Sequence, residues 1–253
     1  MIKVSYYIVT YDRLYDVVVN QLSSEERDNI TCYNIQKKVP KNISCLVKNQ
    51  INEWELTWNE YHYQTHQYYE YGTLVHLLKN SELIDGATHI GLMHYDVIFN
   101  KNCVIDINNE LEKNPNTIFY QRILPNPQLS LLKEEVQHLC TFMSEKLDMY
   151  IDSEMVWNVG WVSEALSITP KSVCMKFAKF LYDYHSEIED ILKSNRWNIM
   201  HHCPHRICGI VERMWGFYLM SCNLPMKKMN IIHEWDSYQH KHMDMNGSGA
   251  ATI

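Results

Sequence analysis

The sequence predicts an α/β fold, a mostly parallel central sheet flanked by helices. Residues 3–10 form a short apolar run rich in β-branched and aromatic side chains, which is typical of a buried strand. Residues 88–99 form a longer, nearly continuous apolar run, the pattern of a strand covered on both faces. Helical segments lie between such runs, and alternating strands and helices favour parallel strands joined by crossovers. We therefore expect residues 88–99 to form the central strand.

The other elements follow from apolar periodicity and from chain-breaking residues. We expect helices over 13–22, within 53–80, and over 106–113, 131–150, 170–192 and 206–221, and strands over 31–35, 117–122, 154–163 and 229–234. No repeat and no Gly/Ser-rich or Pro-rich linker divides the chain. We expect a single domain over residues 1–242 and a flexible tail over 243–253.

Composition restricts the classes of partner. The chain has 253 residues, 46% of them hydrophobic, enough for one large core, and its net charge is -7. The sequence shows no concentration of basic residues that could bind a phosphate backbone, so we expect no nucleic-acid partner. No run approaches the roughly 18–20 apolar residues of a transmembrane segment. Because the eight cysteines are scattered without a CxxC pair, reduced thiols and a cytoplasmic location are expected.

Two familiar phosphate-binding motifs are missing from the sequence. Neither the dinucleotide signature GxGxxG nor the phosphate loop GxxxxGK[ST] occurs, and the chain has only eight glycines. The sequence therefore offers no Gly-rich loop whose backbone N–H groups could bind phosphates. We infer that any bound nucleotide diphosphate must be neutralised by a metal ion or by cationic side chains.

The triplet His94-Tyr95-Asp96 lies near the end of the expected central strand. In open α/β sheets, ligands bind where the carboxyl ends of the strands meet the following loops. Imidazole and carboxylate both suit Mn²⁺, and carboxylate suits Mg²⁺, so His94 and Asp96 are candidate ligands of a divalent cation. His233, at the end of the last expected strand, could add a ligand. The alternatives are that Asp96 only turns the chain and that His233 is structural.

Two further clusters of polar residues could take part in catalysis or bind a metal ion. Asp152 and Glu154 precede the aromatic segment 156–161, and either carboxylate could orient or deprotonate a sugar hydroxyl held against aromatic rings. The alternative is a helix or loop cap. The cluster His201–His205 invites a zinc interpretation, but Pro204 breaks any helical face and no second ligand pair follows at the usual distance. We favour a structural loop there.

Three ordered segments resemble a known family. Residues 49–58 (Asn-Gln-Ile-Asn-Glu-Trp-Glu-Leu-Thr-Trp), 89–99 (His-Ile-Gly-Leu-Met-His-Tyr-Asp-Val-Ile-Phe) and 205–213 (His-Arg-Ile-Cys-Gly-Ile-Val-Glu-Arg) are similar to motifs of capsular-polysaccharide and viral glycosyltransferases with the GT-A fold. Residues 157–162 are similar to a further segment of that family, and the match spans about 45–220. The resemblance implies a GT-A-like, Rossmann-like sheet and a nucleotide diphosphate sugar as donor.

The resemblance also implies roles for individual residues. Glu55 and Thr57 would lie near the donor, and Thr10, Tyr11 and Asp12 would contact the nucleobase. Arg206, Glu212 and Arg213 would lie at the pocket or brace it; a partly buried ion pair is the alternative for the last two. Where the family has two arginines after His-Tyr, this chain has Asp96 and Val97. An aspartate can offset diphosphate charge only through a cation, which makes metal dependence plausible.

Together these features predict a hexosyl- or deoxyhexosyltransferase of polysaccharide biosynthesis, of viral or bacterial type. It would move a sugar from a nucleotide diphosphate sugar to a hydroxyl of a glycan acceptor, assisted by Mn²⁺ or Mg²⁺. The alternative is a catalytically silent module that binds glycans or nucleotides through its many tyrosines and tryptophans.

Overall fold

A computed structural model describes residues 2–10, 14, 16–37, 46–60, 62–63, 68–95, 97–125, 131–163, 165–194 and 207–232. The strands are β1 Val4–Thr10, β2 Ile30–Asn34, β3 Asn49–Asn52, β4 His89–His94, β5 Ile98–Phe99, β6 Ile118–Tyr120, β7 Ile123–Leu124, β8 Trp161–Val162, β9 Ser167–Pro170, β10 Met226–Lys228 and β11 Ile231–Ile232. The helices are α1 Asp16–Val19, α2 Ser24–Asp28, α4 Glu70–Lys79, α5 Cys103–Lys113, α6 Lys133–Leu147, α7 Ser153–Val159, α8 Lys171–Ser194 and α10 Ile207–Ser221, with 3₁₀ turns η2 Glu53–Glu55 and η3 Ser81–Ile84.

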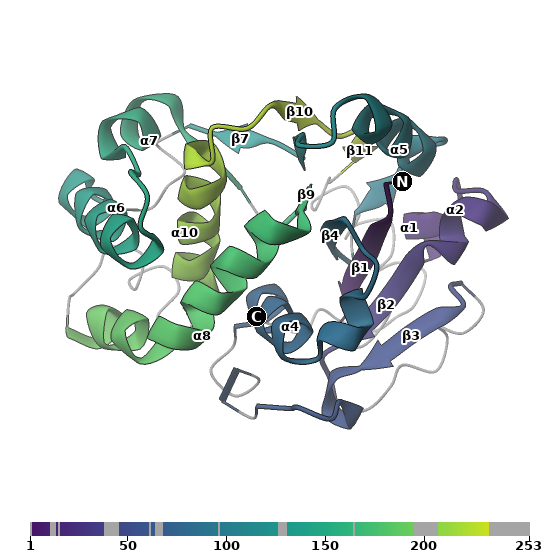
Figure 1. The fold of residues 1–253 in the computed structure, drawn as a ribbon, viewed down its shortest axis with the longest axis horizontal. Coiled ribbons are helices and arrows are strands. Elements are labelled where there is room, and N and C mark those ends of the chain that lie inside the picture. The colour runs from purple at the N-terminus through teal and green to yellow at the C-terminus, as the bar shows by residue number, and fades with distance from the viewer. Residues whose placement is uncertain are drawn as a thin grey trace, which may run out of the picture.

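The central sheet runs in the order β10-β6-β9-β4-β1-β2-β3 (Figure 1). Neighbouring strands pair in parallel except at β9, which is antiparallel to both β4 and β6. Of the strands in this sheet that the structure describes, only β9 is reversed. The predicted fold class, a mostly parallel sheet flanked by helices, is confirmed.

Alternating side chains of β1 enter two separate cores. Tyr7 and Val9 pack in the core that α4, α8 and α10 cover, whereas Tyr6 and Ile8 pack in the core that α1 and α5 cover. Because successive side chains of a strand point to opposite faces, both faces of the sheet are buried. In Figure 1, α4, α8 and α10 lie together on one side of the sheet. None of the described helices is long and apolar enough to cross a membrane.

The expected central strand ends earlier than its apolar run. β4 stops at His94, and the chain turns before β5, which pairs with β11 in a separate small sheet. The apolar side chains beyond the turn still enter the core on the α1 side, as Val97 and Phe99 do. An apolar run therefore indicated burial correctly, but not one continuous strand.

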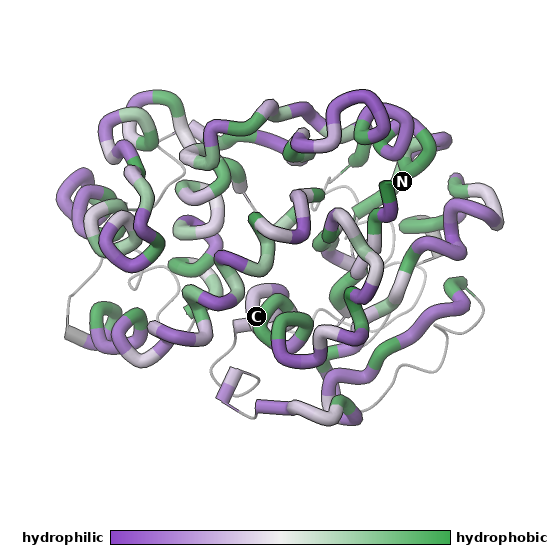
Figure 2. The backbone as a smooth tube through the Cα atoms, viewed as in Figure 1, coloured by the Kyte–Doolittle hydropathy of each residue, from purple (hydrophilic) through white to green (hydrophobic). Residues whose placement is uncertain are grey.

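Several further elements differ from the expectations. The segment expected as a strand over 154–163 is mainly helix α7, followed by the two-residue β8. The sequence pattern also missed β3, β9, β10 and the short helix α2. Figure 2 shows that β3, at the edge of the sheet, is largely hydrophilic. An edge strand with exposed side chains lacks the apolar signature that strand prediction depends on.

Candidate functional site

The carboxyl ends of β1, β2, β3 and β4 lie side by side, and this row of strand ends is called the carboxyl edge of the sheet. Strand register pairs Val9 with His94, Thr10 with Asn34, and Asn34 with Asn52. Two predicted site residues, Thr10 and His94, thus lie on adjacent strand ends. This is the edge at which open α/β sheets bind ligands.

A carboxylate lies beside His94 at this edge. The Nε2 atom of His94 is 3.6 Å from the Oε1 atom of Glu70, the first residue of α4, and the two side chains are 21% and 8% exposed. A negative charge in the first turn is favoured by the positive end of the helix dipole. The pair therefore places an imidazole and a carboxylate, both possible metal ligands, at the end of β4.

Backbone strain is located next to this pair. Tyr69 precedes Glu70 with φ 47° and ψ -121°, a positive-φ conformation that residues other than glycine rarely adopt. Such a residue costs about 1–3 kcal/mol and persists where its surroundings hold it in place. Since strained residues of this kind cluster at functional sites, Tyr69 is consistent with a functional role for the start of α4.

Tyr71, which follows Glu70 in α4, is a buried tyrosine. Burial raises the pKa of the Tyr71 phenol well above 10, and the negative charges of Glu212 and Glu70 raise it further, against an opposing effect of Arg213. The buried phenol oxygen has no hydrogen-bond partner in the described structure. Arg213, from another predicted motif, thus acts electrostatically on a tyrosine next to Glu70, the partner of His94.

Arg213 braces α10 against β8. Its Nη1 atom donates to the Glu212 carboxylate at 2.9 Å and to the Gly209 carbonyl at 3.0 Å. Its guanidinium carbon lies 4.7 Å from the centre of the Trp161 ring, a cation–π contact. With the two charged side chains 13% and 23% exposed, the contacts show the partly buried ion pair considered as the alternative for Glu212 and Arg213. A role at the donor pocket stays a prediction.

Glu55 and Thr57 follow the end of β3, as the motif predicted, and both are exposed. Glu55 accepts a hydrogen bond from the Asn52 side chain at 3.1 Å. Two residues earlier, at the start of η2, Oε1 of buried Glu53 lies 2.7 Å from Nδ1 of His76 on α4. The loop is thus anchored to α4 while Glu55 and Thr57 remain exposed.

The predicted nucleobase contact is only partly within the described residues. Thr10 is fully buried, and its hydroxyl lies 3.4 Å from the Cys32 sulfur and 3.5 Å from the Tyr33 carbonyl oxygen. Tyr95 is partly exposed beyond the end of β4. Tyr11, Asp12, Asp96, Arg206, His233 and the cluster 201–205 lie outside the described residues. The roles assigned to those residues stay predictions.

The side chains at the carboxyl edge of the sheet supply part of a ligand set for a divalent cation. His94 supplies an imidazole and Glu70 a carboxylate, a combination that Mn²⁺ accepts. No cluster of three or more His, Cys, Asp or Glu side chains that could hold a metal occurs within the described ranges. A complete site would need a ligand from elsewhere, and the predicted ligands Asp96 and His233 are the candidates.

Asp152 and Glu154 lie at the start of α7. Oδ1 of Asp152 accepts hydrogen bonds from the backbone N–H groups of Glu154 and Met155 at 3.0 and 3.1 Å, the geometry of a helix N-cap. Glu154 is exposed and forms an ion pair with Lys133 at 2.8 Å. Figure 1 shows α7 well apart from α4 and β3. The contacts favour the cap interpretation of Asp152; its role as a base stays a prediction.

The cap and the base can be separated by two substitutions. Asp152→Ala is expected to lower the free energy of unfolding by about 1 kcal/mol, because two helix N–H groups lose their acceptor. Asp152→Asn keeps the side-chain oxygen and should retain near-normal stability, as measured by urea denaturation. Asparagine cannot accept a proton as a base. A large loss of glycosyl transfer in a normally stable Asp152→Asn protein would therefore identify Asp152 as the base.

Sequence reasoning did not single out Glu70 or Trp161 as site residues. Glu70 is an acidic residue at the start of an aromatic-rich helical segment, a helix-start signal that could have marked it. Trp161 was visible only as part of an aromatic segment. Their contacts with His94 and Arg213 join residues far apart in the sequence.

The mostly parallel sheet and its polar carboxyl edge define an α/β fold of the kind that binds ligands at its strand ends. Among solved structures, the chain is similar to the apo structure of WbbM, a bifunctional glycosyltransferase, with a TM-score of 0.56 and 12% sequence identity. The similarity covers 90% of this chain and 45% of that one, so this chain spans less than half the length of WbbM's. A likeness at this identity establishes the fold. No protein-family model and no curated protein sequence matches the chain.

Proposed function

We propose that the protein transfers a hexosyl or deoxyhexosyl group from a nucleotide diphosphate sugar to a hydroxyl of a growing glycan. The observation that carries the proposal is the His94–Glu70 pair at the carboxyl end of the central strand, in a fold shared with a glycosyltransferase. Ligands of α/β sheets bind at this edge. The exposed residues Glu55 and Thr57 lie at the end of β3 on the same edge.

We assign to His94 and Asp96 the binding of a divalent cation, with His233 or Glu70 as further ligands. When bound, Mn²⁺ or Mg²⁺ would offset the negative charge that develops on the leaving diphosphate. The cationic alternative for the same task is the pair of arginines Arg206 and Arg213. Of the two, Arg213 already shares its charge with Glu212, which favours the cation.

Calorimetric titration with nucleotides tests the proposal directly. We expect one of UDP, GDP and dTDP to bind in the presence of Mn²⁺, and to bind more weakly after the cation is removed with EDTA. Binding of glycans without binding of any nucleotide would instead support the silent binding module. Nucleotide binding that does not depend on a cation would still support the transferase. It would assign the neutralisation of the diphosphate charge to the arginines instead of to a metal ion.

A further inference from the structure

Buried polar side chains hold the loop over residues 53–60, which follows β3. Because β3 ends at Asn52, in register with the end of β2, the loop begins at the carboxyl edge of the sheet. Glu55 and Thr57 in this loop are exposed, whereas Glu53 is buried. Burial of a carboxylate is costly unless other groups offset the loss of its hydration. The contacts of Glu53 therefore show how the loop is held.

The Glu53 carboxylate joins the loop to β2 and to α4. Its Oε1 atom accepts a hydrogen bond from the Tyr33 hydroxyl at 3.5 Å and lies 2.7 Å from Nδ1 of His76. The second contact is electrostatic rather than an aligned hydrogen bond. The other nitrogen of this fully buried imidazole, Nε2, accepts a hydrogen bond from the backbone N–H of Glu60 at 3.3 Å. His76 thus contacts both ends of the loop.

Asn80, the C-cap of α4, holds the middle of the loop. Its Oδ1 atom accepts a hydrogen bond from the backbone N–H of Trp58 at 3.0 Å, and its Nδ2 atom donates to the Trp58 carbonyl oxygen at 2.9 Å. Nδ2 also donates to the carbonyl oxygen of His76 at 2.9 Å. The Asn80 side chain is buried, and buried polar groups that are fully hydrogen-bonded make a structure rigid.

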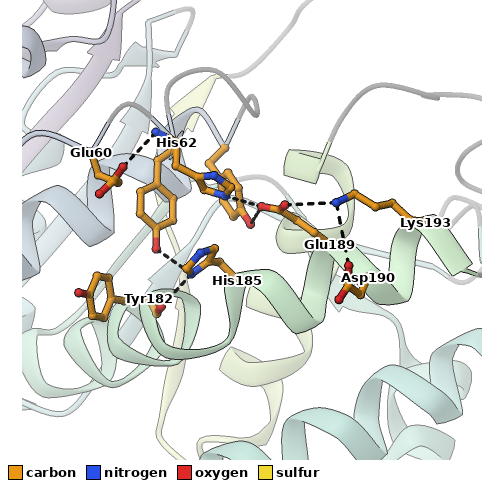
Figure 3. A network of polar contacts seen from close by, with 9 residues as sticks. Glu60, His62, Tyr182, His185, Glu189, Asp190 and Lys193 are labelled. Carbon is orange, nitrogen blue, oxygen red and sulfur yellow. Dashed lines mark hydrogen bonds and ion pairs between the residues drawn. The ribbon is translucent and has the colours of Figure 1, made fainter.

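A further polar network ties the end of the loop to α8 (Figure 3). The Glu60 carboxylate accepts a hydrogen bond from the backbone N–H of His62 at 3.4 Å, and Nε2 of His62 lies 2.6 Å from Oε1 of Glu189. Glu189 is buried on α8 and also accepts a hydrogen bond from the Tyr68 hydroxyl at 3.0 Å. The loop is therefore fixed at its start, middle and end.

Glu55 is the charged side chain that this fixed loop exposes beside the end of β3. Its Oε1 atom accepts a hydrogen bond from the Asn52 side chain at 3.1 Å, which orients the carboxylate. Among the described residues, its Oε2 atom has no hydrogen-bond partner. A carboxylate repels a diphosphate but accepts strong hydrogen bonds from hydroxyl groups. Glu55 therefore suits the hydroxyls of a nucleotide sugar rather than its phosphates.

We propose that Glu53, His76 and Asn80 are positioning residues, which hold the loop in the conformation in which Glu55 binds hydroxyl groups of the donor. The inference rests on the proposed function. A loop that is already ordered binds its ligand without the entropic cost of ordering. When the loop is loosened, the apparent affinity falls with the fraction of molecules in the binding conformation. The KM for the donor should then rise while kcat stays nearly unchanged.

The test compares His76→Phe and Asn80→Ala with wild type. Phenylalanine keeps an aromatic ring at position 76 but offers no acceptor to the Glu60 N–H. Asn80→Ala removes the hydrogen bonds to Trp58 and leaves no buried charge without its partner, so it is informative even if His76→Phe fails to fold. Glu53→Gln keeps an acceptor for Tyr33 and should show a smaller effect of the same kind.

His89→Phe is the matched control. His89 is also a buried histidine with two hydrogen-bond partners, the Pro115 carbonyl oxygen at 2.8 Å and the Thr88 hydroxyl at 3.0 Å. It begins β4, at the opposite end of that strand from the carboxyl edge. A general loss of stability would affect all three variants alike. Loosening of the loop should be confined to His76→Phe and Asn80→Ala.

Hydrogen exchange gives a readout that needs no ligand. In both loop variants, the backbone N–H groups of Trp58 and Glu60 should exchange about tenfold faster or more than in wild type and in His89→Phe, because they lose their acceptors. The KM for UDP-glucose, GDP-mannose or dTDP-rhamnose, whichever the wild type uses, should rise about tenfold. Glu55→Gln should weaken donor binding without changing the exchange of the loop.

Calorimetric titration with UDP, GDP or dTDP and with the matching nucleotide sugar identifies the hydroxyls. Weaker binding of both ligands by the loop variants assigns Glu55 to the ribose, and weaker binding of the nucleotide sugar alone assigns it to the transferred sugar. Unchanged exchange in both loop variants, or faster exchange with unchanged donor affinity, would overturn the inference. A wild-type protein that binds no nucleotide overturns the proposed function, while the exchange rates still decide whether the network orders the loop.

Discussion

Replacing Gly216 by alanine is expected to lower the free energy of unfolding by about 3 kcal/mol or more, the upper range for overpacking a core. α10 approaches β8 so closely that a Cβ atom at Gly216 would overlap the carbonyl oxygen of Val162 and lie 2.9 Å from Cε3 of Trp161. A backbone oxygen cannot rotate away as a side chain can. The helix must therefore move off the strand, which also disturbs the Arg213–Trp161 contact one turn earlier.

Thermal unfolding measures this effect, with Gly72→Ala as the matched control. For a chain of this size the loss corresponds to a fall in Tm of roughly 6–12 °C. Gly72 is also a buried helical glycine, but a Cβ there would meet its nearest neighbours, Tyr63 and Tyr68, at 3.4 Å, an ordinary contact. Alanine in α4 should be neutral or stabilising because of its higher helix propensity. Equal effects of the two substitutions would contradict the packing argument.

Asp96→Ala should reduce transfer by about 10²–10³-fold or more, the scale of losing a group that stabilises developing charge. The variant should also bind the nucleoside diphosphate more weakly in Mn²⁺. The physical reason is that, without its carboxylate ligand, the cation no longer offsets the diphosphate charge. His94→Gln should show the same losses to a smaller degree, because His94 also contacts Glu70.

Initial rates and calorimetric titrations in Mn²⁺ and in EDTA check this prediction. Asp28→Asn, which removes an exposed carboxylate paired with Lys48, serves as the control for loss of charge alone. In EDTA, wild type and Asp96→Ala should bind nucleotide with similar, weak affinity. Near-normal turnover of Asp96→Ala would reject the metal hypothesis and leave the fold assignment untouched.

The elements predicted best from sequence are those with strong periodicity. β1, β2 and the long helix α8 agree with expectation to within a residue or two, because their apolar side chains face the cores. The segment 154–163 was assigned wrongly because its aromatic and β-branched residues favour a strand. Capping by Asp152 and packing of α7 against α6 stabilise a helix there instead. Local propensity is a weak guide where tertiary contacts oppose it.

The candidate site was only partly predictable. The end of the apolar run marked His94 because strand ends bind ligands in this kind of sheet. Its partner Glu70 lies 24 residues earlier in the chain, and no spacing rule connects the two. Likewise, His62 and Glu189 are separated by 127 positions and meet only because α4 packs against α8.

The sequence alone determined the class of fold, the burial of β1 and β4, and the position of a His-Tyr-Asp triplet near a strand end. These depend on apolar periodicity, which is local. Only the tertiary structure decided which polar and aromatic side chains face one another: Glu70 with His94, Arg213 with Trp161, and Glu189 with His62. Such contacts depend on how helices cross the sheet, which is set by the packing of many side chains together.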